Sequence, residues 1–248
     1  MEKIKHHLCI ILDKSGSMVT IRKSALRHAN EQIQTAKGKQ DDFDIKVTFI
    51  TFNYDIDILK SDVGVDEIYE IPLDDYRPNG GTALNDAVGI GIEEVMSKVD
   101  LDSTDVLFAI VSDGEENSST KYPRVGNSDL AEKVQTMQEK FSWTFTYIGT
   151  DDFDLAKAAK MMNIPVSNVR SFARSANAVQ GMSMAYCSSM DEHYSGRVAQ
   201  VKCSGAQGPA GPNGETGECG FDATKIGTNL NFFEDDENIT TESSTDDS

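Results

Sequence analysis

The sequence predicts an α/β protein in which a central sheet is covered by helices on both faces. Apolar runs of strand length alternate along the chain with segments whose apolar side chains recur every three or four residues. Such alternation is typical of βαβ units packed into one layered domain. Two of the strand runs, at 8–12 and 106–111, consist almost entirely of apolar side chains, as expected for buried strands.

In the first half of the chain, each element follows from its own pattern. Residues 21–37 carry apolar side chains at three- and four-residue steps, which predicts a helix that ends at Gly38. Residues 44–53 are rich in β-branched and aromatic side chains and are predicted to form a strand. Residues 55–62 are expected to return as its hairpin partner at the edge of the sheet. A second amphipathic helix is predicted at 84–99.

The second half of the chain continues the alternation. A buried strand is followed by a helix, a strand, a short helix stopped by Asn163 and Pro165, a last strand and a closing helix. The predicted bounds of these elements are 106–111, 129–141, 142–149, 151–162, 164–172 and 175–193. Together with the first half, they predict one domain over residues 1–194.

Beyond residue 194 the composition changes. Residues 195–225 are expected to be a linker, in which glycine recurs at every third position through the triplets of residues 205–222. The period is collagen-like, but so few triplets with so little proline hold a triple helix weakly, which favours a flexible linker over a trimerising stalk. Residues 226–248 contain acidic side chains and no Lys or Arg, and are predicted to be a disordered tail.

The charge and the apolar runs exclude several classes of partner. A formal net charge of −18 argues against binding to nucleic acid or to an anionic membrane surface. No run has the length of a membrane span or of a secretory leader, so the chain is expected to be cytoplasmic, with a virion or another assembly as the alternative. The four cysteines lack zinc-like spacing, and Cys203 and Cys219 could pair only under oxidising conditions.

Oxygen-bearing side chains follow two of the predicted strands. Asp13, Ser15 and Ser17 stand at alternate positions directly after the first strand, and Asp113 follows the strand at 106–111. Thr82 precedes the helix at 84–99. In an open parallel sheet, ligands bind at the carboxyl ends of the strands. Carboxylates and hydroxyls gathered at that edge suit a hard cation such as Mg²⁺.

Asp-x-Ser-x-Ser after one strand, a lone Thr before a helix and an Asp closing a second strand resemble the metal-ion-dependent adhesion site of the von Willebrand factor A family. The resemblance covers roughly residues 5–193. It implies a Rossmann-like, doubly wound and mostly parallel sheet with one short antiparallel edge strand. It also implies that a single Mg²⁺, or Mn²⁺, is bound by the following residues, partly through water: Asp13, Ser15, Ser17, Thr82 and Asp113.

The function that this resemblance implies is a binding module, in which the ion captures a Glu or Asp side chain of a partner protein. The chain is expected to be a monomer, with a trimer as the alternative if the Gly triplets associate. An enzyme of the haloacid dehalogenase kind also uses a strand-terminal Asp with Mg²⁺, but it needs a second carboxylate where this chain has Ser15. The sequence therefore predicts no enzyme, whereas a structural component of a virus particle is compatible with a binding module.

Residues near these positions are assigned plainer roles. Asp86 is expected to interact with the dipole of its helix, and residues 115–117 to surround the site without binding the ion. Residues 118–120 are predicted to be a solvated loop. The four histidines share no spacing and are expected at the surface or at the rim: His6, His7, His28 and His193.

Overall fold

The structure, a computed structural model, describes residues 3–123, 128–151, 154–173, 175–204 and 232–233. Six strands form one sheet in the order β3-β2-β1-β4-β5-β6. The strands are β1 Ile4–Asp13, β2 Phe43–Phe52, β3 Ile56–Gly64, β4 Thr104–Val111, β5 Thr144–Thr150 and β6 Val169–Phe172. The α-helices are α1 Arg22–Lys37, α2 Leu84–Met96, α3 Ser128–Phe141, α4 Leu155–Met161 and α5 Ala176–Ser204. Short 3₁₀ turns occur at Gly16–Ile21, Leu73–Asp75 and Val166–Asn168.

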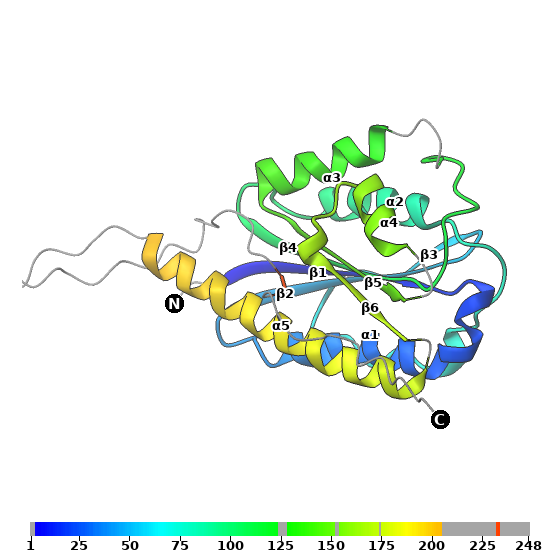
Figure 1. Cartoon of the computed structure of the whole chain (residues 1–248). Coiled ribbons are helices and arrows are strands. Elements are labelled where there is room, and N and C mark those ends of the chain that lie inside the picture. The colour runs from blue at the N-terminus through cyan, green and yellow to red at the C-terminus, as the bar shows by residue number, and fades with distance from the viewer. Residues whose placement is uncertain (1–2, 124–127, 152–153, 174, 205–231, 234–248) are drawn as a thin grey trace, which may run out of the picture.

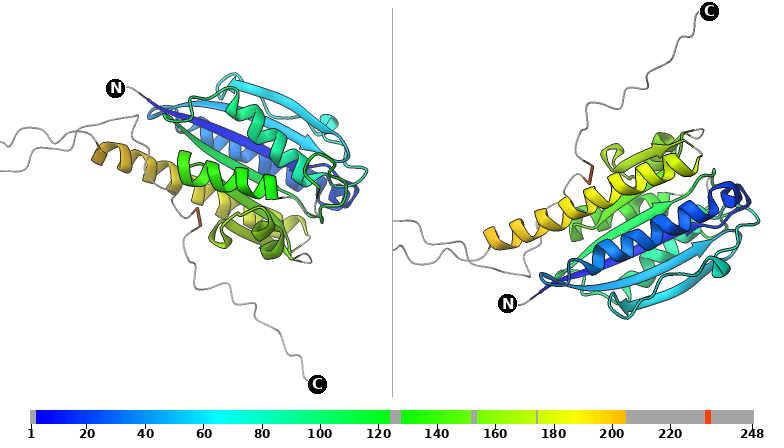
Figure 2. Two further views of the ribbon diagram at one scale, coloured as in Figure 1. Left: turned by 90° about the horizontal axis from the view of Figure 1, so that it is seen from above. Right: turned by 90° about the horizontal axis from the view of Figure 1, so that it is seen from below.

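The predicted fold class is confirmed. Every neighbouring pair of strands is parallel except β2 and β3, which are antiparallel, so β3 is the expected antiparallel edge strand. Helices α1 and α5 cover one face of the sheet, and α2, α3 and α4 cover the other (Figure 1). The views from above and below in Figure 2 show the same two layers, with α1 and α5 side by side.

The position of β1 inside the sheet explains why its sequence is apolar without alternation. Leu8 and Ile10 belong to the core under α1 and α5, whereas Cys9 and Ile11 belong to the core under α2, α3 and α4. Because both faces of a parallel sheet are covered by helices, both sets of alternating side chains must be apolar. The same holds for β4, whose residues are buried throughout.

The order of the strands places a crevice beside β1. From β1 the chain builds outward through β2 to β3, and then returns through α2 to β4 on the other side of β1. The direction of winding therefore reverses between β1 and β4. In doubly wound sheets, ligands bind outside the carboxyl ends of the strands at such a reversal.

The closing helix is longer than the sequence predicted. It continues past the expected end of the domain at residue 194 and ends at Ser204. Arg197 and Val201, four residues apart, are buried against the domain, so this extra length packs on the core. The predicted domain boundary at 194 is therefore too early, and the Gly triplets of 205–222 lie outside the described residues.

A cluster of buried polar residues holds α5 to the sheet. Asp105 of β4 is fully buried and lies 2.8 Å from Nε of Arg197, 2.6 Å from Nδ1 of His6 and 3.4 Å from Nε2 of His193. Arg197 also donates a hydrogen bond to the carbonyl of Ser142 at 3.0 Å. This ion cluster (His6, Asp105, His193 and Arg197) joins β1, β4 and α5 at the end of the sheet where β1 begins.

The expectation that the histidines lie at the surface is wrong. His6, His7, His28 and His193 are all buried. His28 of α1 lies 2.8 Å from the hydroxyl of Ser183 on α5, and His7 lies 2.9 Å from that of Thr48 on β2. Burial lowers the pKa of both His7 and His28 to about 3, so both rings are neutral and serve packing.

The predicted tail also contributes to the core. Phe232 and Phe233 are 2% and 5% exposed and belong to the cluster under α1 and α5. The rest of residues 226–248 lies outside the described residues, as do Cys219 and the predicted linker beyond Ser204. No helix in the described part of the chain is long and apolar enough to cross a bilayer.

Candidate metal centre

The predicted oxygen ligands come from three loops at the carboxyl edge of the sheet. Asp13 is the last residue of β1, and the turn that follows it carries Ser15 and Ser17. Asp113 stands two residues after β4 ends, beside β1. Thr82 lies two residues before α2 begins. Since β1 and β4 flank the reversal of winding, the fold itself brings these loops together.

Asp13 is fully buried, and both of its carboxylate oxygens accept hydrogen bonds. Oδ1 accepts from the backbone N–H of Ser15 at 2.6 Å, and Oδ2 accepts from the hydroxyl of Ser112 at 2.6 Å. Burial raises the pKa of Asp13 to about 6; the two hydrogen bonds act in the opposite sense, and the charge of Asp113 adds to the increase. A bound cation would stabilise the charged form of this carboxylate, which burial alone makes unfavourable.

The two serines connect Asp13 to Asp113. The hydroxyls of Ser15 and Ser17 lie 3.0 Å apart, and the hydroxyl of Ser17 donates a hydrogen bond to Oδ1 of Asp113 at 2.6 Å. Asp113 is 2% exposed, whereas Ser17 is exposed. The sequence spacing Asp-x-Ser-x-Ser thus becomes a continuous line of hydrogen-bonded groups that starts at the buried Asp13 and passes through the exposed Ser17 to Asp113.

Thr82 faces the same space as Ser17. A methyl group added to Gly114 would lie 3.2 Å from Oγ1 of Thr82 and 3.5 Å from Oγ of Ser17. Both hydroxyls therefore point into the small volume that the missing side chain of Gly114 leaves open. A side chain at Gly114 would crowd both hydroxyls.

The loop that carries Thr82 is fixed on two sides. The N–H of Gly16 donates to the carbonyl of Gly80 at 3.1 Å, which ties the loop to the serine turn. Gly80 has a φ of +78°, a conformation that strains other residues. On the other side, the N–H of Thr82 donates to Oδ1 of Asn117 at 3.0 Å, and the N–H of Asn117 donates back to the carbonyl of Thr82 at 3.0 Å.

Residues 116–122 do more than the sequence predicted. Glu116 accepts hydrogen bonds from the N–H of Asn85, at the start of α2, and from Ser119. Asp86 accepts from the N–H groups of Thr120 and Tyr122, among others. Residues 118–120 form a loop that is partly exposed, as predicted, but these acidic side chains also bind the segment to α2. Asp86 anchors this loop as well as standing in the first turn of its helix.

Two supporting residues were not predicted. Ser112 holds Oδ2 of Asp13, and the hydroxyl of Tyr76 donates to the carbonyl of Asp13. Ser112 directly precedes Asp113, so its position at a strand tip was a usable sequence signal. Tyr76 is 63 residues from Asp13 in a segment without regular pattern, and nothing in the sequence indicated the contact.

The donor set fits a hard divalent cation. It consists of two carboxylates, from Asp13 and Asp113, and three hydroxyls, from Ser15, Ser17 and Thr82. Oxygen-only ligands are those preferred by Mg²⁺ and Mn²⁺. In the described parts of the chain, no group of three or more His, Cys, Asp or Glu residues suited to a metal occurs. The assignment of these five residues to a metal stays a prediction.

Comparison by sequence finds no matching family profile and no matching curated protein. Comparison of structures does find similar proteins. A von Willebrand factor type A protein from Catenulispora acidiphila matches with a TM-score of 0.55 at 15% identity, covering 76% of this chain and 43% of that one. The von Willebrand factor domain of the type V pili tip protein Mfa5 from Porphyromonas gingivalis matches with a TM-score of 0.50 at 11% identity, covering 74% and 95%.

Proximal thread matrix protein 1 from the mussel byssus is also similar, with a TM-score of 0.51 at 14% identity over 73% of this chain and 45% of that one. This chain therefore spans less than half the length of two of these three structures. At such low identity the likeness concerns the fold. Together with the strand order and the single antiparallel edge strand, it confirms the predicted fold.

Proposed function

Because the chain has the von Willebrand factor A fold, we propose that it is a protein-binding module that depends on a divalent metal. The proposed ligands of one Mg²⁺ or Mn²⁺ are Asp13, Ser15, Ser17, Thr82 and Asp113. The observation that carries the proposal is the line of contacts from the buried Asp13 through both serines to Asp113, with Thr82 facing the same space.

The composition of the site suggests what it binds. Three of its five side chains are neutral hydroxyls, so the protein supplies few anionic oxygens. When bound, the ion would supply a Lewis-acidic position for one more anionic ligand. A Glu or Asp side chain from a partner protein fits that position, and a charge-assisted contact of this kind is strong and lost when the metal is removed.

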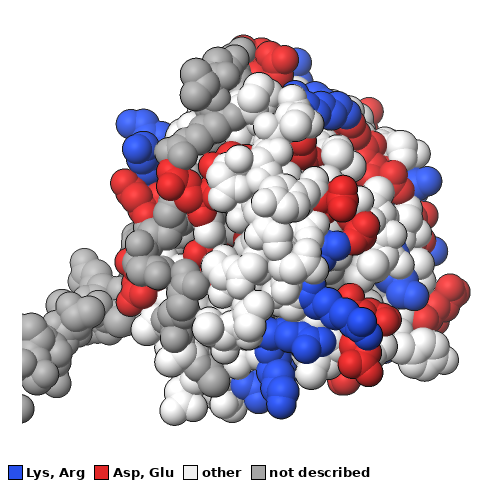
Figure 3. All heavy atoms as spheres, turned by 90° about the vertical axis from the view of Figure 1, so that its right-hand side faces the viewer, with Lys and Arg blue, Asp and Glu red and all other residues white. Residues whose placement is uncertain are grey.

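The surface around the site supports recognition by contact more than by long-range attraction. Figure 3 views the end of the domain where the parallel strands have their carboxyl ends. Acidic and basic side chains are interspersed around a central area that shows few of either. Mixed rim charges give little steering of a partner of one sign. Partner choice is therefore expected to depend on the loops around the site, chiefly residues 53–79 and 114–128, of which 124–127 lie outside the described residues.

Calorimetric titration of the full chain with Mg²⁺ and with Mn²⁺ tests the proposal. We expect one site in the wild type and none in Thr82→Val, which keeps the shape of the side chain and removes its hydroxyl. Lys14→Ala is the matched control within the serine turn, because the ammonium of Lys14 pairs with Asp57 and not with the site. Equal binding by the wild type and Thr82→Val would remove Thr82 from the ligand set.

The affinity for Mg²⁺ is expected to depend on pH through Asp13. The pKa of Asp13 is about 6 without metal, so protons compete with the ion below that pH. The association constant should be constant above about pH 7 and should fall by about tenfold per pH unit below about pH 5.5. Titrations at several pH values in one buffer series check this. A constant affinity down to about pH 5 would contradict a role for the Asp13 carboxylate.

An enzyme of the phosphohydrolase kind is the less favoured function. The position two residues after Asp13 is Ser15, whose hydroxyl contacts Ser17, so no general acid stands there. The histidines of the described domain are buried in its core and not directed at the site. We expect no turnover of a simple phosphate ester in the presence of Mg²⁺. Turnover that is lost in Asp13→Ala would favour the enzyme instead.

A capture experiment addresses the partner. Proteins retained by the full chain with Mg²⁺ should be lost with EDTA and should not be retained by Asp13→Ala. Retention that survives both changes would place the binding surface elsewhere. A role inside a larger assembly is compatible with this proposal, and the identity of retained proteins would distinguish it.

A further inference from the structure

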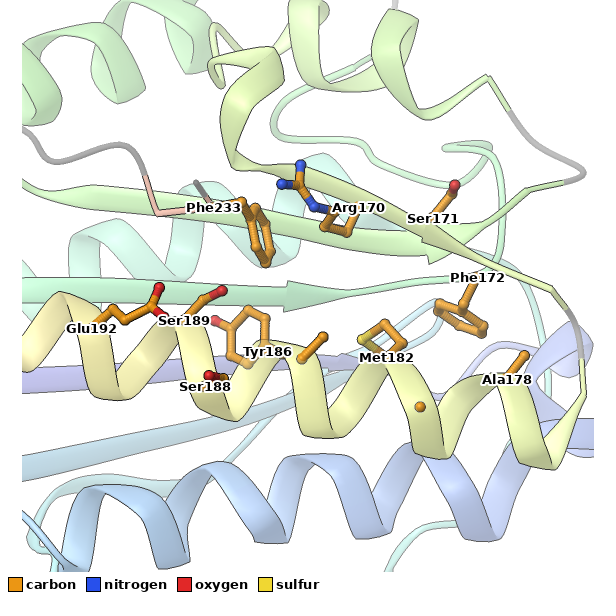
Figure 4. A pocket seen from close by; sticks show the side chains of 12 residues that line it. Arg170, Ser171, Phe172, Ala178, Met182, Tyr186, Ser188, Ser189, Glu192 and Phe233 are labelled. Carbon is orange, nitrogen blue, oxygen red and sulfur yellow. The ribbon is translucent and has the colours of Figure 1, made fainter. Parts of the chain in front are cut away.

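A groove lies between the edge strand β6 and helix α5. Its cavity has a volume of about 450 Å³ and is lined by Arg170 and Phe172 of β6, by α5 and by Phe233. Small side chains on α5 make the groove hollow, since a methyl group added to Gly181 would meet no atom within 4 Å. Figure 4 shows the side chains of β6 and α5 facing each other across this space, with Phe233 toward one end of it.

Phe233 forms part of the wall of this groove, and Phe232 packs beside it against Tyr186. Both are almost fully buried, although they belong to no helix or strand. The ring centroid of Tyr186 lies 4.9 Å from that of Phe232 and 5.9 Å from that of Phe233. The N–H of Phe232 donates a hydrogen bond to Oδ1 of Asn168 at 3.0 Å, and the guanidinium of Arg170 lies 4.2 Å from the centre of the Phe233 ring.

These contacts have the character of peptide recognition. Two adjacent aromatic side chains pack against Tyr186, the oxygen of a side-chain amide accepts from one backbone N–H, and a guanidinium covers one ring. Buried aromatic anchors paired with Arg are typical of the few residues that dominate binding energy at protein interfaces. The groove also extends past this segment, because Phe172, Ala178 and Met182 line the cavity beyond Phe233 (Figure 4).

The connection of this segment to the domain allows exchange between molecules. Residues 205–231 separate α5 from Phe232, and they include the Gly triplets. A chain of that many residues, at about 3.3 Å per extended residue, is long enough for the Phe232–Phe233 segment of one molecule to reach the groove of a neighbour. We propose that the groove between β6 and α5 is a peptide-binding site for the Phe232–Phe233 segment of a second copy of this chain, with the segment of the same chain as its resident competitor.

Two complementary full-length variants test the exchange. The first, Phe232→Ser with Phe233→Ser, keeps the groove and loses the segment. The second, Ala185→Arg, places a long side chain at an exposed groove position and keeps the segment. Each variant alone should sediment as a monomer. An equal mixture should form a heterodimer, because only the mixture combines an open groove with a free segment.

A labelled peptide of residues 226–239 measures the same contact directly by fluorescence anisotropy. It should bind the Phe232→Ser, Phe233→Ser chain, and should bind the wild-type chain at least about tenfold more weakly, because the tethered segment competes. A peptide with both Phe residues replaced by Ser is the control, and adding Arg170→Ala to the open chain should weaken binding several-fold by removing the cation–π contact.

A cleavable chain tests the proposal even if the variant with Phe232→Ser and Phe233→Ser does not fold. With a specific protease site inserted between residues 215 and 216, cleavage leaves the Phe segment intact but untethered. Exchange of that segment for the labelled peptide would support the proposal. A mixture that stays monomeric, or a cleaved segment that never exchanges, would show that Phe232 and Phe233 are a permanent part of the core and would overturn it.

Discussion

Arg197→Ala is expected to lower the free energy of unfolding by about 3–5 kcal/mol, because it leaves the buried carboxylate of Asp105 without its cationic partner. Arg197 and Asp105 are 1% and 0% exposed, with Nε 2.8 Å from Oδ1. Burial alone would raise the pKa of Asp105, but Arg197 and hydrogen bonds from His193 and His6 outweigh it and hold the pKa well below its ordinary value.

The sign of the pH dependence follows from that lowered pKa. Asp105 contributes stability above its unfolded pKa, near 4, and this contribution is lost as the pH falls through the folded value. In Arg197→Ala, Asp105 can instead take up a proton. The variant should therefore be destabilised most near neutral pH and less at about pH 4. Urea unfolding at both pH values measures the difference.

A surface ion pair on the same helix provides the control. Lys39 lies 2.8 Å from Asp191 of α5, with both side chains partly exposed. Lys39→Ala should cost less than about 1 kcal/mol, because exposed pairs are weak. Replacing the buried pair as a whole, with Asp105→Leu and Arg197→Met, should recover much of the lost stability. Equal losses in Arg197→Ala and Lys39→Ala would mean that the ion cluster does not hold α5.

Asp13→Asn is expected to abolish the binding of Mg²⁺ and at the same time to stabilise the metal-free domain. The folded-state pKa of Asp13 is about 6 against an ordinary value of 3.8. A raised pKa means that the stability contributed by this group is present below about pH 4 and is lost as the pH rises through about 6. Near neutral pH the buried charge therefore destabilises the fold, on the order of 1–3 kcal/mol.

Asparagine keeps the shape of the side chain and removes the charge. Its amide can still accept from the N–H of Ser15 and donate to the hydroxyl of Ser112, so both hydrogen bonds have a replacement. With EDTA near neutral pH, Asp13→Asn should unfold at higher urea than the wild type. At about pH 4 the two should be equal.

Adding Mg²⁺ should reverse the order of stability, so that the wild type becomes more stable than Asp13→Asn. Binding to the folded state stabilises the wild type by about 2.7 kcal/mol at a concentration one hundred times Kd, and leaves the variant unchanged. An increase in stability with Mg²⁺ that is the same in both chains would place the ion elsewhere. If Asp13→Asn without metal were less stable than the wild type near neutral pH, the buried charge of Asp13 would not be destabilising the fold.

The strands, and the placing of the candidate ligands at the carboxyl edge of the sheet, were predictable from the sequence because their signals are local. A buried strand is a continuous apolar run, and Asp13 and Asp113 follow such runs directly. A parallel sheet then brings the carboxyl ends of neighbouring strands to one edge, whatever the rest of the chain does. Thr82 was found through its position before a helix, although the structure shows that Asn117 and Gly80 position it.

The histidines and the end of α5 could not be predicted in the same way. His6 is buried because of Asp105, 99 residues away, and Arg197 is buried because of the same carboxylate. In the sequence alone, Arg197 directly after Gly196 indicates the end of a helix. Only its partner Asp105 explains why Arg197 is buried. Phe232 and Phe233 stand beside acidic residues, so composition predicted disorder. In the structure, both rings pack against Tyr186 of α5, which is far away in the sequence.

The candidate site and the end of α5 lie at opposite ends of the domain, which determines the direction in which a pulling force would act on it. The site at Asp13 lies at one end of the sheet, whereas β1 begins and α5 ends at the opposite end (Figure 1). A partner held at the site and pulled against the chain beyond Ser204 would stretch the domain along its strands. β1 is paired along its length with β2 and over most of it with β4, so tension in this direction shears both ladders together instead of opening them one bond at a time. Resistance to force is governed by the barrier to unfolding. A pull on α5 from beyond Ser204 would have to break the packing of Val201 and then the ion pair of Arg197 with Asp105.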